Sequence, residues 1–161
     1  MPTQRPVAVR LIEGSRGSVP AAELRRIARR VLTDEVVTPA VGVEVVIAGV
    51  DTVQTLNRLY RGQDEPTDVL SFAASEGEAF VDAEEEEPSL GEVIVCLPIA
   101  RAQAEAAGRP LAGEVAHLLV HGLLHILGHD HEGSADAARM QAREDELLQA
   151  LGYTGMYAHG H

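Results

Sequence analysis

The sequence predicts an α+β fold, a single domain with one mixed sheet of about four strands and about five helices. Short β-branched segments and longer segments with helical apolar spacing both occur, but they do not alternate strictly along the chain. The length of 161 residues corresponds to one domain, and an apolar share of 45% is enough for a hydrophobic core. We therefore expect residues 1–161 to form one domain, with 155–161 as a frayed tail.

Four segments are short, rich in β-branched residues and bounded by turn residues, and we predict them as strands. They are residues 6–12, 41–50, 67–73 and 91–97. Five segments have the apolar spacing of helices. They are residues 20–32, 51–62, 98–108, 110–128 and 134–151. The acidic segment 75–89 is predicted as a solvated loop or hairpin excursion between strands.

Proline and glycine mark the predicted helix ends. Pro20 stands where a first helical residue belongs, since proline suits that position. Asp51 is predicted as an N-cap with Gln54 at the capping-box position, and Gly62 closes that helix. Gly128 ends the fourth helix, because glycine adopts the left-handed conformation without steric cost.

Composition excludes several classes of protein. Aromatic residues make up 3% with no Trp, which argues against a single-stranded nucleic-acid binder that stacks bases on exposed aromatic rings. The single cysteine, Cys96, excludes an internal disulfide and a cysteine-rich zinc finger, and is predicted as a buried strand residue. The N-terminal segment lacks a signal-peptide pattern, and no run approaches the roughly 20 apolar residues of a membrane span. We expect a cytoplasmic protein without membrane association.

Charge is distributed unevenly along an acidic chain of net charge −12. Residues 1–63 carry nine Arg against six acidic residues, a net of +3, whereas residues 64–161 carry four Arg against 19, a net of −15. One predicted helix holds a cluster of four arginines. They are Arg25, Arg26, Arg29 and Arg30. A solvated helix face and a local phosphate-facing patch both remain open for this cluster.

The segment HGLLHILGHDH, residues 121–131, has the spacing of a metal site. His121 and His125 are four residues apart, so both imidazoles lie on one helix face and can bind one ion. His117 continues the row but lies eight residues from His125, roughly 12 Å along the axis, too far to share it. Gly128 can turn the chain so that His131 returns as a third ligand. Three nitrogen ligands leave a fourth position open, which is typical of catalytic rather than structural zinc.

Other residues near this segment have weaker interpretations. His117 is predicted to pack or to hydrogen-bond to a ligand. Asp130 either orients a ligand imidazole or shapes the turn. His159 and His161 are predicted as tail residues without a role.

Gly122 distinguishes this segment from a zinc protease. The protease pattern is H-E-x-x-H-x-x-G-x-x-H, in which the Glu is the general base. Here the spacing is identical, but Gly122 occupies the Glu position. A close approach by substrate or by a neighbouring strand would explain why no side chain is present. The site is therefore predicted to act on something other than a peptide.

Three blocks of sequence resemble the bacterial YbeY family, metal-dependent endoribonucleases of ribosomal RNA maturation. HGLLHILGHDH resembles its H-G-x-L-H-L-x-G-y-D-H signature, and LNRLYRGQDEPTDVLSF (56–72) resembles its L-N-x-x-Y-R-x-x-D-x-P-T-D-V-L-S-F block. LGEVIVCLPIARAQA (90–104) is similar to its L-G-D-I-x-I strand, with Glu92 in place of the commoner Asp. The resemblance covers roughly residues 45–155.

The resemblance implies a set of site residues and one zinc ion per chain. His121, His125 and His131 would be the zinc ligands, on the helix that carries the signature. Arg61 matches the active-site arginine of the family, and a guanidinium offers a fork of donors suited to phosphate. By itself, Arg61 could equally be a surface charge favoured by the helix dipole. Asp68 and Ser71 are weaker candidates in the strand that lines the cleft.

The resemblance also implies a function: single-strand-directed, hydrolytic cleavage in ribosomal RNA processing, notably 3′-end maturation of 16S rRNA, and ribosome quality control. Expected partners are ribosomal RNA, the small subunit and ribosome-associated proteins, with no DNA. The net negative charge of the chain is unfavourable for binding RNA, so a ribosomal partner would supply part of the affinity for RNA. A metallopeptidase-like zinc hydrolase and a non-catalytic assembly factor remain alternatives. The general base is unassigned, and attack by water or by the RNA 2′-hydroxyl stays open.

Overall fold

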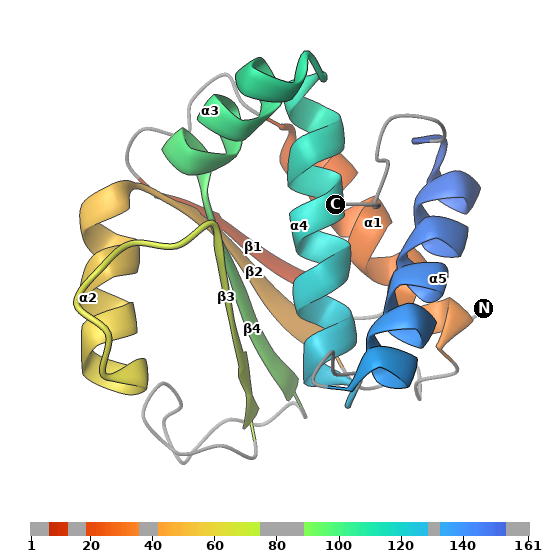
Figure 1. Cartoon of the computed structure of the whole chain (residues 1–161), viewed down its shortest axis with the longest axis horizontal. Coiled ribbons are helices and arrows are strands. Elements are labelled where there is room, and N and C mark those ends of the chain that lie inside the picture. Colours follow the sequence, from red (N-terminus) through yellow and green to blue (C-terminus); the bar gives the residue numbers. More distant parts are fainter. Residues whose placement is uncertain (1–6, 13–18, 36–41, 75–88, 129–132, 154–161) are drawn as a thin grey trace.

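The computed structural model describes residues 7–12, 19–35, 42–74, 89–128 and 133–153. The described residues form nine helices and strands, which Figure 1 labels. They are β1 (Val7–Leu11), α1 (Ala21–Asp34), β2 (Gly42–Ala48), α2 (Val50–Arg61), β3 (Val69–Ala73), β4 (Ser89–Cys96), α3 (Leu97–Ala107), α4 (Leu111–Ile126) and α5 (Ser134–Leu151). The acidic segment 75–88 and the tail 154–161 lie outside the described residues. None of the described helices is long and apolar enough to cross a membrane.

The four strands form one mixed sheet in the order β1-β2-β4-β3. β2 pairs in parallel with both β1 and β4, whereas β3 pairs antiparallel with β4 and forms one edge. The predicted α+β class is confirmed, and the described part of the chain contains the expected four strands and five helices. The strand predicted at 41–50 ends earlier than expected, because Val50 already begins α2.

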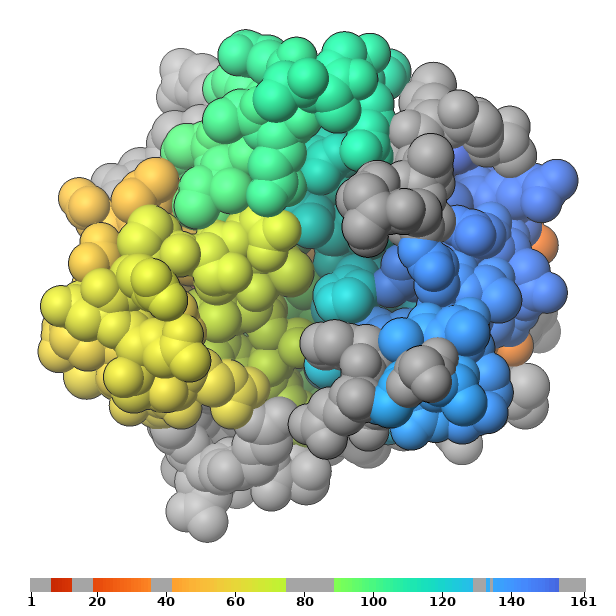
Figure 2. All heavy atoms as spheres, in the orientation of Figure 1, coloured from red at the N-terminus to blue at the C-terminus, as the bar shows by residue number. Residues whose placement is uncertain are grey.

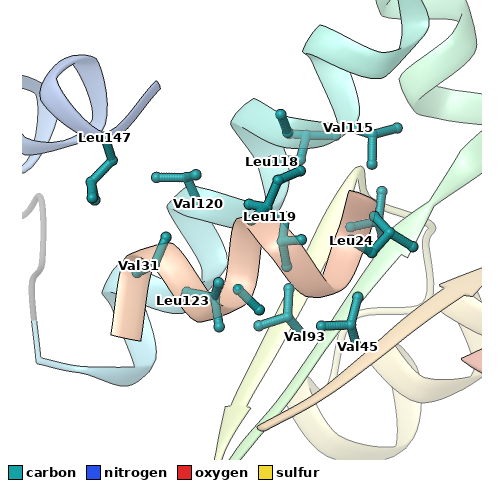
Figure 3. Packing of buried hydrophobic residues seen from close by; sticks show 14 of the residues in the cluster. Leu24, Val31, Val45, Val93, Val115, Leu118, Leu119, Val120, Leu123 and Leu147 are labelled. Carbon is teal, nitrogen blue, oxygen red and sulfur yellow. The ribbon is translucent and has the colours of Figure 1, made fainter. Parts of the chain in front are cut away.

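Helices cover the two faces of the sheet unequally. α1, α4 and α5 lie on one face and α2 on the other, with α3 near one end of the sheet (Figure 1). Successive strand residues point to opposite faces, so Val45 and Val93 join the larger cluster under α1 and α4, whereas Val46 and Ile94 face α2. Figure 3 shows this larger cluster, built from aliphatic side chains of α1, α4, α5 and the sheet. Aliphatic packing is what the scarcity of aromatic residues predicts.

The predicted capping box of α2 is wrong. The N-cap is Gly49, in an extended conformation, and no side chain caps the helix. β2 ends at Ala48, so the helix begins before Asp51, which lies within its first turn. Gln54 instead uses its amide to bind Asp64 across the loop after the helix, at 3.1 Å. The other end follows the prediction: Gly62 is left-handed, with φ of 73°.

The arginines of α1 bind partners within the protein. Arg26 pairs with Glu23 at 2.8 Å, and Arg30 pairs with Asp34 at 2.8 Å. Arg25 donates to the carbonyl of Val7 at 3.3 Å. These contacts support the solvated helix face and give no support to a phosphate-facing patch.

A carboxylate pair lies on the α2 face of the sheet. Glu44 of β2 and Glu92 of β4 are register partners, and Arg10 of β1 contacts both, at 2.5 Å and 3.7 Å. Burial, together with the hydrogen bond and the negative charge of Glu44, raises the pKa of Glu92 to about 7, although Arg10 opposes the shift. Glu92, the residue that replaces the commoner Asp, is therefore largely protonated in the folded chain below neutral pH.

Glu92→Gln is expected to remove a pH dependence of stability. Because the folded-state pKa of Glu92 exceeds the ordinary value of 4.5, the folded state holds this proton more tightly, and its contribution to the free energy of unfolding falls as pH rises from about 4.5 to 7. A neutral glutamine avoids that loss. In urea titrations at pH 8, the free energy of unfolding of the variant should exceed that of the parent by an amount on the order of 1–3 kcal/mol. At pH 5 this difference in the free energy of unfolding should be smaller. If variant and parent differ in free energy of unfolding by the same amount at both pH values, the raised pKa of Glu92 is contradicted.

Candidate metal centre

The histidine row occupies the partly exposed flank of a helix that is otherwise largely buried. α4 packs between the sheet, α1 and α5, and most of its residues are inaccessible. His117, His121 and His125 recur every four residues along the flank that is partly open. α4 ends at Ile126, and Gly128 has a positive φ of 101°, as predicted for a turn. His131, together with His129 and Asp130, lies outside the described residues.

Two of the three helical rings lie at the separation that a shared ion requires. The centroids of His121 and His125 are 5.1 Å apart. Two imidazoles that bind one tetrahedral ion at about 2.0–2.1 Å have centroids about 5 Å apart. His117 and His121 are separated by 6.5 Å, which is wider. The ring separation therefore suits one shared ion better for His121 and His125 than for His117 and His121.

Two imidazoles alone do not complete a metal site. Among the described residues, no group of three or more His, Cys, Asp or Glu side chains is gathered as metal ligands would be. A metal ion on these two rings would need a third ligand from outside the described residues, and the sequence offers His131. The donor set would be three neutral nitrogens, which zinc accepts.

Glu144 of α5 joins two histidines of the row. Nδ1 of His121 lies 2.5 Å from one carboxylate oxygen, and Nε2 of His117 lies 3.3 Å from the other. Burial would raise the pKa of Glu144, but the hydrogen bonds and the charges of both imidazoles outweigh it and lower the pKa to about 2. Glu144 is thus an ionised carboxylate in a residue that is only 4% exposed.

Sequence reasoning missed Glu144, although a signal was present. The buried face of α5 carries Met140, Leu147, Leu148 and Leu151. Glu144 falls in the same helical stripe, four residues after Met140 and four before Leu148. A lone carboxylate within an apolar helix face is rarely buried without a partner. Which partner it has could not be read from the sequence, because His117 and His121 are more than 20 residues away.

Gly122 faces the sheet at close range. A Cβ at this position would lie 2.7 Å from Cγ1 of Val93 and 3.4 Å from Cγ2 of Val69. Real Cβ atoms do not approach a neighbour as closely as 2.7 Å, so α4 rests on the sheet with no room for a side chain. A neighbouring strand, the second of the two explanations, therefore accounts for the missing glutamate. The helix in this position has no space for a protease-type base.

Gly122→Ala is expected to destabilise the protein. Overpacking against a stiff valine costs roughly 1–3 kcal/mol, and the higher helix propensity of alanine returns about 1 kcal/mol. The free energy of unfolding should therefore fall by about 1 kcal/mol in urea titrations. In a Val93→Ala background the added methyl has room, so the same substitution should cost less or stabilise. An equal cost in both backgrounds would mean that the contact with Val93 is not its source.

Arg61 lies at the end of α2, in a segment fixed by several contacts. Its Nη2 donates to the backbone carbonyl of Ser71 at 2.7 Å, and its guanidinium lies 4.5 Å from the ring centroid of Phe72. One turn earlier, the buried Asn57 donates to the carbonyl of Glu65 at 2.8 Å and holds the loop that follows the helix. The "LNRLYRGQDEPTDVLSF" block thus builds one local structure that positions the guanidinium at the edge of β3.

The anchor of Arg61 is connected to the histidine pair through the sheet. Ser71 of β3 is the register partner of Val93 in β4. Val93 in turn contacts the backbone of α4 at Gly122, the residue next to His121. In Figure 2 the flank of α4, in teal, lies recessed between β3, in yellow-green, and α5, in blue. The predicted arginine, anchored at β3, and the predicted histidine ligands, on α4, therefore lie on neighbouring elements of the same side of the molecule.

The weaker candidates have structural roles. Asp68, the residue before β3, accepts a hydrogen bond from the amide of Gln103 in α3 at 3.2 Å, which ties the start of the strand to that helix. Ser71 contributes its backbone carbonyl to Arg61. Cys96 is fully buried, as predicted, and burial raises the pKa of its thiol.

Known proteins share both the sequence pattern and the fold. The family model described as "Endoribonuclease YbeY" matches residues 12–152. A curated relative of that name from Verminephrobacter eiseniae is 38% identical over 143 residues, which cover 89% of this chain and 84% of the relative. Another, from Pelotomaculum thermopropionicum, is 44% identical over 131 residues, covering 81% and 86%. A third, from Cupriavidus necator, is 45% identical over 104 residues, but these are only 49% of its length.

A solved structure gives the same result for the fold. The solution structure of TM1509 from Thermotoga maritima matches with a TM-score of 0.55 at 25% identity, covering 90% of this chain and 91% of that one. Sheet, helices and histidine-bearing flank together define an α+β protein with a candidate metal centre beside an edge strand. The family match covers most of its length, and the chain belongs to the YbeY family.

Proposed function

We propose that this protein is a metal-dependent endoribonuclease that cleaves single-stranded ribosomal RNA. The observation that carries the proposal is the pairing of His121 and His125 on α4, whose ring centroids are 5.1 Å apart. This pair lies beside the edge of the sheet where Arg61 is anchored. Relatives with 38–45% identity are named as endoribonucleases, which supports the same reaction here. Gly122 weighs against the metallopeptidase alternative, because Val93 occupies the space that a glutamate base would need.

Each site residue has a distinct part in the proposed mechanism. His121 and His125, with His131, would hold one Zn²⁺ ion per chain through neutral nitrogens. The bound metal would supply polarisation of a phosphodiester oxygen and a lowered pKa for a water molecule. Arg61 would bind the scissile phosphate and stabilise the charge that develops on it. Its contacts with Ser71 and Phe72 hold the guanidinium in place before substrate arrives, which reduces the entropy lost on binding.

The proposed biological substrate is the 3′ end of 16S rRNA, with a further role in ribosome quality control in the cytoplasm. A net charge of −12 is unfavourable for RNA binding by the chain alone. Two of the four α1 arginines, Arg26 and Arg30, are paired with carboxylates, which reduces what this cluster can offer to RNA. A small-subunit protein or another ribosome-associated partner would therefore contribute part of the affinity.

The deciding experiment measures bound zinc per chain and cleavage of a single-stranded ribosomal RNA fragment, before and after metal removal. One zinc per chain, with cleavage lost on chelation and restored by zinc, is the expected result. Intact RNA with a full complement of zinc would favour the non-catalytic assembly factor. Cleavage of an unfolded protein by the zinc-loaded chain would favour the metallopeptidase.

A further inference from the structure

We propose that Glu144 is a positioning residue of the metal centre: its carboxylate holds the Nδ1–H of His121 and so directs Nε2 of that ring toward the metal. This inference rests on the proposed function, since it takes His121 as a ligand. It adds a residue from a different helix, far from the histidine segment in sequence.

The hydrogen-bond geometry determines which nitrogen of His121 is available. The Nδ1 atom lies 2.5 Å from Oε2 of Glu144. Each oxygen of the Glu144 carboxylate faces one imidazole nitrogen, and a carboxylate accepts the hydrogen bonds of both rings, so Nδ1 of His121 is the donor and carries the proton. In a neutral imidazole the lone pair is then on Nε2, the nitrogen that remains for a ligand bond. Replacing Glu144 removes the acceptor that favours the Nδ1–H tautomer of His121 and restrains the orientation of its ring.

The carboxylate of Glu144 also gives a role to His117, the first histidine of the row. His117 donates from Nε2 to Oε1 of Glu144 at 3.3 Å. A buried carboxylate is costly unless several donors satisfy it, and His117 supplies the second donor that Glu144 needs. The three helical histidines therefore have different parts: His117 supports Glu144, Glu144 orients His121, and His121 pairs with His125.

The backbone around Glu144 is itself held in place. The neighbouring Arg143 contacts the carboxylate of Glu35 and donates to the carbonyl of Asp34 at 3.0 Å, which ties α5 to the end of α1. Two residues beyond the end of α5, Tyr153 donates to Glu23 of α1 at 2.5 Å. A carboxylate carried on a helix with such attachments is well suited to fix a ligand, because its own position does not drift.

The test compares Glu144→Ala and Glu144→Gln with Glu146→Ala, a control that removes one carboxylate from the exposed side of the same helix. Zinc affinity is measured by competition with a chromophoric chelator. Loss of such an outer partner typically weakens metal binding 10–100-fold, which is the expectation for Glu144→Ala. Glu144→Gln should bind zinc with intermediate affinity, because its amide oxygen can still accept from Nδ1 while its NH₂ group opposes the donor of His117. Glu146→Ala should match the parent.

A second readout needs no metal. Long-range ¹H–¹⁵N NMR of the metal-free protein distinguishes the two imidazole tautomers. His121 should be protonated at Nδ1 in the parent and should lose that preference in Glu144→Ala, while circular dichroism confirms that the variants remain folded. If Glu144→Ala fails to fold, the isosteric Glu144→Gln carries both measurements.

The possible failures are distinguishable. A parent that binds no zinc would overturn the proposed function, and the tautomer measurement would still decide whether Glu144 orients His121. A parent that binds zinc, with folded Glu144 variants that bind it equally tightly and keep His121 protonated at Nδ1, would overturn the inference while the proposed function stands.

Discussion

His125→Ala is expected to abolish RNA cleavage and to reduce bound zinc well below one ion per chain. His125 lies on the open flank of α4 with its ring 5.1 Å from that of His121, so its removal leaves too few nitrogen ligands to retain the ion. Metal polarisation of a phosphodiester contributes several kcal/mol to transition-state stabilisation, which corresponds to a rate loss of about 1,000-fold or more. Cleavage of the RNA fragment and zinc content should be measured on the same preparations.

A matched control shows whether the loss of zinc and activity is specific to His125 or follows the removal of any histidine. His159→Ala removes a histidine of the C-terminal tail that has no assigned role, and it should retain both zinc and activity. His125 is only partly buried, so the alanine variant should keep the fold, which circular dichroism checks. If His125→Ala cleaves as fast as the parent, the cleavage comes from a contaminant and the proposed mechanism fails.

Arg61→Ala is expected to lower kcat by roughly 100–1,000-fold, as removal of one charge-stabilising donor does in other enzymes, with zinc content unchanged. The guanidinium is anchored on Ser71 and Phe72 of β3, and neither of these two contacts involves α4, the helix that carries the predicted ligands. Arg61→Lys keeps the charge but loses the planar fork, so its rate should fall between those of the parent and the alanine variant. Single-turnover cleavage and zinc content are the measurements.

Arg58 provides the control for charge alone. It lies on the same helix, is half-exposed, and makes a 3.8 Å surface pair with Asp64. Arg58→Ala removes the same positive charge, and its effect on kcat should be small. Full activity in Arg61→Ala would end the assignment of Arg61 while leaving the metal site intact. Equal losses in both variants would show that Arg61 acts through general electrostatic attraction of RNA.

Local signals predicted most of the fold. The last helix was predicted at 134–151 and observed at Ser134–Leu151, because its apolar stripe and the glycine that follows are both local features. The start of α2 was predicted wrongly, because a plausible capping box at Asp51 competes with the point where β2 leaves the sheet. Sheet order is not a local property, and the placement of β3 at an edge came only from the structure.

The candidate site divides in the same way. Helical periodicity by itself places His121 and His125 on one face, and their neighbouring rings agree with it. Arg61 stood out only by resemblance to the family, since one arginine at a helix end is an ordinary surface charge. Glu144 was missed, because its partners lie on another helix and nothing near it in sequence indicates them.

The sequence by itself determined the elements, the aliphatic core, the pairing of His121 with His125 and the absence of a protease glutamate at Gly122, because each depends on residue type and short spacing. Only the tertiary structure decided why Gly122 carries no side chain, where Arg61 is anchored and what Glu144 binds. Each of these three depends on contacts between residues at least ten positions apart. Such contacts form only when the helices pack on the sheet, and no local pattern encodes them.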